Sequence, residues 1–206
     1  METPLTEKEL LEGINSNDSE TRTDAWLRAG EVGVSAIRPL AATMVRYGPI
    51  VARQAKELAQ LEISGNDDET RRQIAAKQEQ LQSALEAARA AKKALAKIVR
   101  HAGRPGAGED RTAAVAELLR LLDAGQPLMI RREAISLLSE IADDQVVAPL
   151  AALLNDPDLR EDARLALERI PSGQSLDALQ AGLAAVPNDF KINIAQSLRA
   201  RGVDVP

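Results

Sequence analysis

The sequence of 206 residues has no cysteine and very few aromatic residues. Without cysteine it cannot form a disulfide bond or a thiolate metal site, and this absence fits a reducing compartment. Trp, Tyr and Phe occur once each and together make up 1% of the chain. Because β-strands favour aromatic and β-branched residues, a core that draws on Leu, Ala, Ile and Val favours closely packed helices over sheets.

Long apolar runs are missing as well. No stretch approaches the ~20 consecutive apolar residues of a membrane-spanning helix, and residues 1–10 lack a basic segment followed by an apolar one. We therefore expect a cytoplasmic protein with no membrane partner. The formal net charge is −5, and with so few aromatic rings for base stacking we also expect no nucleic-acid partner.

A repeated helical unit is the main feature that the sequence does contain. Asp156 and Pro157 predict a helix start, since a carboxylate caps free N–H groups and a proline at the first helical position loses no hydrogen bond. An apolar stripe follows at spacings of four, four and three residues, which places it on one helical face: Leu159, Ala163, Leu167 and Ile170.

The same frame recurs along the chain. Its anchor residues Ala134, Ala163 and Ile194 lie 29 and 31 residues apart. A second helix follows each first one, and its sequence P-L-A-A occurs both at residues 39–42 and at residues 149–152. Such a helix pair buries little apolar surface alone, so neighbouring pairs must stack to form a core.

These motifs resemble the HEAT repeat, in the short bacterial form of roughly 30 residues that is also seen in phycobilisome-lyase-type proteins. The resemblance covers about residues 16–202, apart from one insertion. It implies an all-α fold of the ARM type, a right-handed α-α superhelix of about four and a half repeats. It says little about function, because this architecture serves many unrelated roles.

One insertion interrupts the repeats. The sequence V-A-R-Q-A-K of residues 51–56 is restated as A-A-R-A-A-K in residues 87–92, with Ser64-Gly65-Asn66 between them as a helix break. We therefore expect a helical-hairpin insertion over residues 49–84, within a single solenoid of residues 1–206. The expected helices, in chain order, cover residues 6–14, 19–29, 34–46, 49–63, 68–100, 109–123, 128–141, 146–154, 158–170, 176–185 and 189–201.

The only histidine lies at the start of a Gly-rich segment. His101 has Arg100 and Arg104 as neighbours, and a loop of this composition could bind a phosphate or carboxylate. We favour the alternative that these cations offset the dipole at the C-terminus of a helix. A single histidine without cysteine offers no zinc site, so we expect no metal and no cofactor.

Other charged residues are expected to serve the fold. Carboxylates occur in pairs at expected helix starts, where they cap N–H groups and interact favourably with the helix dipole: Asp67/Asp68, Asp143/Asp144, Asp156/Asp158 and Glu161/Asp162. The same position of the repeat carries a basic residue in four places: Arg22, Arg131, Arg160 and Lys191. The resemblance implies that these basic residues form a ladder of ion pairs with acidic residues of neighbouring repeats. We assign no catalytic residue, and the His-Glu pairs of HEAT-type hydroxylases are absent.

In proteins of this kind the second helices line the concave face. The corresponding positions here are mostly small, with a few charges, and form a groove that a partner's helix or extended segment could enter. A solvated face without a ligand is an equally good interpretation. The candidate partner-binding residues are Arg38, Ala42, Arg120, Ala152, Asp177 and Ala181.

We therefore expect a scaffold or adaptor that binds a protein partner and is not an enzyme. One alternative is an enzyme on the same fold, either a bilin-lyase-type subunit or a divergent DNA glycosylase. Another is a fragment of a longer protein in which the repeats only position other domains. The helix expected at residues 189–201 has no second helix after it and should expose Ile192 and Ala195. This edge predicts self-association, a partner contact, or a natural chain that continues.

Overall fold

A computed structural model describes residues 3–65 and 67–205 of the chain, and every regular element in these two ranges is helical. The expected all-α class is therefore confirmed. Contacts between residues group the chain into two compact units, Met1–His101 and Ala102–Pro206. The continuation of both units in one solenoid stays a prediction.

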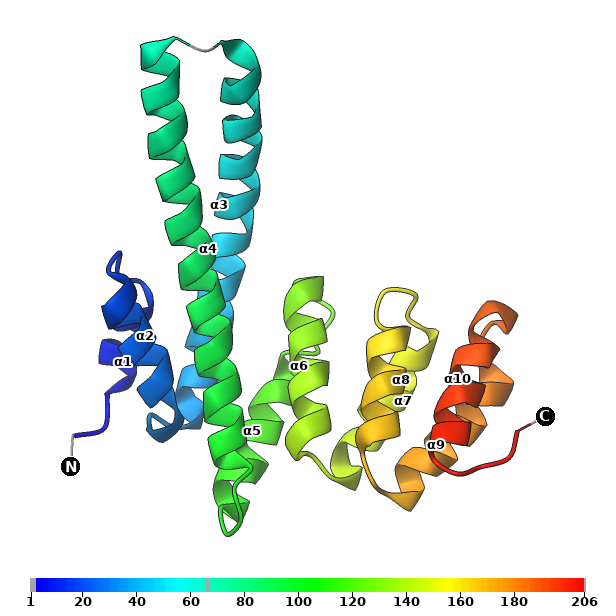
Figure 1. Cartoon of the computed structure of the whole chain (residues 1–206). Helices are drawn as coiled ribbons and strands as arrows, with labels where there is room; N and C mark the ends of the chain where they lie inside the picture. The colour runs from blue at the N-terminus through cyan, green and yellow to red at the C-terminus, as the bar shows by residue number, and fades with distance from the viewer. Residues whose placement is uncertain (1–2, 66, 206) are drawn as a thin grey trace. The chain divides into compact units, whose positions relative to one another are not determined.

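The first unit contains two short helices and one long helical hairpin. Figure 1 shows α3 and α4 side by side, extending well beyond α1 and α2. Short 3-10 turns at Ala29–Glu31 and Val34–Ala36 connect α2 to α3. The helices are α1 (Glu7–Ile14), α2 (Ser19–Arg28), α3 (Ile37–Ser64) and α4 (Asp68–Ala102).

Side-chain caps determine where several of these helices begin. The Glu9 backbone N–H donates to Thr6 Oγ1 at 3.2 Å, and the Thr6 N–H donates to Glu9 Oε2 at 2.8 Å, which forms a capping box at the start of α1. Asp18 accepts the Thr21 N–H at the start of α2, at 2.8 Å. Asp67 does the same for α4 through the Thr70 N–H, also at 2.8 Å.

A close helix contact holds α1 against α2. A Cβ atom built on Gly13 would lie 2.6 Å from the Ala25 Cβ, so only glycine allows this approach. Leu10 and Ile14 of α1 are completely buried beside it. The short first helix thus covers the apolar end of the first unit, as expected for a terminal element of stacked helices.

The expected helix end at Tyr47-Gly48-Pro49 is wrong. Helix α3 continues through Pro49 to Ser64. A proline in a helix interior costs about 3 kcal/mol, because it removes one hydrogen bond and crowds the preceding turn. Packing outweighs this cost, since Leu40 and Met44 are buried before Pro49 and the later half of α3 lies along α4. There the Lys77 Nζ is 2.7 Å from Glu57 Oε2.

The second unit is a succession of shorter helices. We call α6, α8 and α10 the first helices, and α5, α7 and α9 the second helices. Helix α6 contacts α8, α8 contacts α10, and α7 packs against α8 and α9. The elements are α5 (Gly108–Arg120), α6 (Leu128–Ile141), α7 (Val147–Ala152), α8 (Arg160–Arg169), α9 (Gly173–Ala185) and α10 (Asn188–Ala200), with 3-10 turns at Asp144–Val146 and Leu153–Asn155.

The first helices repeat one burial pattern. The anchors Ala134, Ala163 and Ile194 are each buried, and so are the positions one, three and four residues after them, while the position two residues after is exposed or half-buried. The repeat frame predicted from the sequence is therefore present in three dimensions. Ile192 is 64% exposed, as expected, but the expectation that Ala195 faces outward is wrong, because it is only 7% exposed.

The predicted helix start at Asp156 and Pro157 is wrong, because α8 begins at Arg160 and its N-cap residue Leu159 makes no side-chain cap hydrogen bond. The Asp156 carboxylate nevertheless accepts the Asp158 N–H at 3.0 Å, and the Asp156 carbonyl oxygen accepts the Arg160 N–H at 2.8 Å. Asp156 therefore caps the turn that leads into α8. Its carboxylate also lies 3.4 Å from an Arg131 nitrogen.

Arginines at the shared repeat position link successive elements. Arg131 of α6 pairs with Asp156, and Arg160 of α8 pairs with Asp189 of α10 at 2.8 Å. In the first unit Arg22 pairs with Glu86 and is only 5% exposed. The expected ladder of arginines and acidic neighbours is present at these three positions.

We expect Leu167→Ala to lower the free energy of unfolding by about 2–5 kcal/mol, because the side chain is 0% exposed and its loss leaves a cavity. Chemical denaturation followed by circular dichroism measures the change. Leu165→Ala on the same helix is the control and should cost clearly less, since Leu165 is only half-buried. Equal losses from the two variants would contradict the burial pattern.

Candidate functional site

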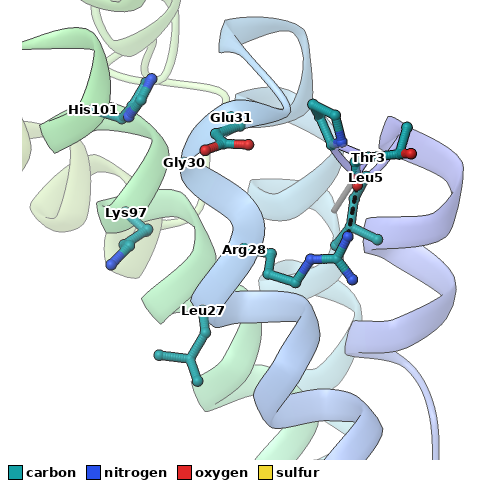
Figure 2. Close-up of a pocket in the computed structure, with 9 residues that line it drawn as sticks. Thr3, Leu5, Leu27, Arg28, Gly30, Glu31, Lys97 and His101 are labelled. Carbon is teal, nitrogen blue, oxygen red and sulfur yellow. Dashed lines mark hydrogen bonds between the residues drawn. The ribbon is translucent and has the colours of Figure 1, made fainter. Parts of the chain in front are cut away.

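A groove runs between α2 and α4 in the first unit. Near the end of α2 it widens into a cavity of about 760 Å³. Figure 2 shows Lys97 and His101 of α4 beside the last turn of α2, with Arg28 and the N-terminal segment on the far side of α2. The lining residues are Thr3, Pro4, Leu5, Leu27, Arg28, Gly30, Glu31, Lys97 and His101.

One wall of this cavity is held in place by Arg28. Its guanidinium donates to the Thr3 carbonyl oxygen at 2.8 Å, the dashed bond in Figure 2, and pairs with Asp24 at 3.1 Å. Leu27, the next residue along α2, is 48% exposed. The cavity therefore combines an apolar surface with basic side chains from two helices.

His101 packs against the end of α2. A Cβ atom on Gly30 would lie 3.3 Å from the His101 Cβ, so the two backbones approach closely here. Arg100 and His101 belong to the last turn of α4, not to a loop, and Arg104 forms an ion pair with Asp110 at 3.1 Å. Anion binding by Arg100, His101 and Arg104 stays a prediction, and the contacts favour packing and charge pairing at these positions.

The groove continues toward the start of α2 as a second cavity of about 280 Å³. Its central residue is Trp26, whose ring lies 4.7 Å from the Lys93 Nζ. Arg89 also lines it, as do Arg22 and its partner Glu86. Hydrogen bonding from Gln82, together with Arg22, lowers the pKa of Glu86 below its ordinary value, so this carboxylate is charged at neutral pH.

All of the predicted partner-binding residues are exposed. In the second unit Ala152 of α7 and Ala181 of α9 lie on helices that contact each other. Arg38 and Ala42 lie one turn apart on α3 of the first unit. Partner binding at these positions stays a prediction. The complete set is Arg38, Ala42, Arg120, Ala152, Asp177 and Ala181.

The most densely bonded charged cluster lies between α8 and α10. Arg164 is only 7% exposed and donates to Glu161 at 2.9 Å and to Glu168 at 3.0 Å. Ser197 of α10 is completely buried, donates to Glu168 at 2.6 Å and accepts from Arg164. Arg164 and Ser197 stand at positions that are buried in every first helix, so their polar groups need hydrogen-bond partners inside the protein. The cluster supplies these partners and therefore stabilises the fold.

None of the helices in residues 3–65 and 67–205 is both long and apolar enough to cross a bilayer. The His, Asp and Glu side chains of the same residues form no group of three that could hold a metal ion.

Comparison of the chain with protein-family models, curated proteins and solved structures found no match. The resemblance to HEAT repeats therefore stays a prediction.

The Glu161–Arg164 pair predicts a specific pH dependence. A side-chain hydrogen bond from Arg164 holds the pKa of Glu161 below its ordinary value of 4.5. Because the pKa is lower in the folded state, the pair stabilises the fold above pH 4.5, and this contribution is lost as pH falls through the folded-state pKa. Glu161→Gln should therefore lower Tm by about 1–3 °C at pH 7, with a smaller difference in acid.

Thermal unfolding of both proteins between neutral and acidic pH measures this difference. Glu109→Gln removes an exposed carboxylate from the first turn of α5 and is the matched control. A Tm difference for Glu161→Gln that stays constant, or grows, toward acid would contradict the assignment.

Proposed function

We propose that this chain is a non-catalytic scaffold or adaptor of HEAT-like repeats that binds a protein partner. In this proposal it forms a right-handed α-α superhelix of about four and a half repeats with one helical-hairpin insertion, and it acts in the cytoplasm. The partner binds the face formed by the second helices.

The observation that carries this proposal is the contrast between the first and second helices of the second unit. In α6, α8 and α10 the anchor residue and the positions one, three and four residues after it are buried. On the second helices, by contrast, Ala152 and Ala181 are exposed, and their side chains are small. Small exposed side chains let the backbone of a partner helix approach closely. The adjacent α7 and α9 thus provide a shallow surface for a helix or an extended segment.

The use of charged groups supports the same function. Arg131 and Arg160 link neighbouring elements, and Arg164 bonds to Glu161, Glu168 and Ser197. These ion pairs engage the charged side chains with neighbouring elements of the fold. The charges in this unit therefore support a rigid binding platform.

A photo-crosslinking amino acid placed at Ala152, and separately at Ala181, tests the proposed face in cells that express the natural protein. We expect both positions to crosslink to the same partner, because they lie on adjacent helices. Ser136 and Gln196 are matched controls, since both are exposed but lie on first helices. Mass spectrometry of the products identifies the partner.

Two results would contradict this proposal. Crosslinks of equal yield from the control positions would show that the second helices are not a specific face. Binding of a tetrapyrrole, seen as a shifted absorption band, or of duplex DNA, seen as a gel shift, would favour the enzyme alternatives instead.

A further inference from the structure

The second half of α4 is strongly basic in an acidic protein. The formal net charge of the whole chain is −5, yet residues 87–108 contain no Asp or Glu. A partner therefore meets a local positive field there, against a background of negative charge. The cations of this segment are Arg89, Lys92, Lys93, Lys97, Arg100 and Arg104.

Three of these cations form a row, which we call the basic stripe. Arg89, Lys93 and Lys97 are four residues apart, so they lie on one face of α4 over about 12 Å. All three are exposed, and none of them forms an ion pair with any residue that the structure describes. This separates them from Arg22 and Arg28, whose charges are paired with Glu86 and Asp24.

The basic stripe lines the same cavities as two large apolar side chains of α2. Arg89 and Lys93 line the cavity that contains Trp26, and Lys97 lines the neighbouring cavity that contains Leu27. The Lys93 ammonium lies over the Trp26 ring, and Leu27 is 48% exposed. Tryptophan and arginine are the side chains most enriched at energetically important positions of protein interfaces.

We propose that the groove between α2 and α4 binds an acidic segment of a partner protein. Its carboxylates pair with Arg89, Lys93 and Lys97, and its apolar side chains cover Trp26 and Leu27. A helix with acidic residues at every fourth position matches the spacing of the basic stripe. This site lies in the first unit and does not depend on binding at the second helices.

The charge balance of the groove supports an acidic protein segment over a polyanion. The lining of the two cavities carries Arg22, Arg28 and the basic stripe against only Glu31 and Glu86. Three available cations over about 12 Å suit a few carboxylates, whereas a nucleic acid or an anionic membrane would extend onto the acidic remainder of the protein and be repelled.

Trp26 is the only tryptophan in the chain, so its fluorescence reports directly on binding in the groove. The probe is a fluorescein-labelled helical peptide of Ala and Leu with Glu at every fourth position, and the same peptide with Gln in place of Glu is its control. We expect the acidic peptide to raise the anisotropy and change Trp26 emission at low salt. Binding should weaken by on the order of tenfold when salt is raised, since exposed charge pairs are screened.

Charge reversal locates the binding site. The triple variant Arg89→Glu, Lys93→Glu, Lys97→Glu should weaken binding by at least about tenfold, and the mild variant Lys93→Gln by several-fold. The matched control reverses three exposed cations of the hairpin, Arg53, Lys56 and Arg72, and should bind nearly as the wild type does. Circular dichroism verifies that each variant remains folded.

Several outcomes would overturn the proposal. One is equal loss of binding in the two triple variants, which would indicate a diffuse charge effect. Others are binding of the Gln peptide as tight as that of the acidic one, or unchanged Trp26 emission at saturation. Tighter binding of single-stranded DNA or phosphatidylserine vesicles, lost in the first triple variant, would assign the basic stripe to a different class of partner.

Discussion

Consecutive helices of the second unit bury their apolar faces against one another, because a single helix pair encloses too little surface to be stable. The constraint is clearest at the anchors Ala134, Ala163 and Ile194, which are nearly or completely buried where consecutive helices meet. At the other end of the chain Gly13 meets the same requirement by allowing α1 to approach Ala25 closely.

The same constraint explains the placement of charge. A polar side chain at a position that is buried in every repeat needs partners, and Arg164 finds them in Glu161, Glu168 and Ser197. Arg201, just after α10, donates to the Ile170 and Ser172 carbonyl oxygens at 2.8 and 2.9 Å, where the polypeptide leaves α8. Cations used in this way stabilise the fold, whereas the basic stripe on α4 forms no ion pair with any residue that the structure describes.

The mistaken expectations share one cause, the dominance of packing over local preference. Pro49 and Asp156 are each strong local signals, for a helix end and for a helix start. Helix α3 continues through Pro49 and is linked to α4 by the Glu57–Lys77 pair, and Asp156 caps a turn before α8 instead of α8 itself. Ala195 was expected to face outward, but it occupies the position at which Ile135 and Arg164 are also buried.

The sequence by itself determined most of the helices, the cap at Asp67, the repeat frame and the exposure of the candidate residues on the second helices. These features depend on spacings within one helix, so a single chain segment carries the information. Only the tertiary structure decided that Trp26 lines one cavity with Lys93 and that Leu27 lines another with Lys97. The groove depends on how α2 and α4, which are distant in the sequence, pack together. The periodicity of a sequence indicates which face of a helix is buried, but it does not indicate which other helix that face contacts.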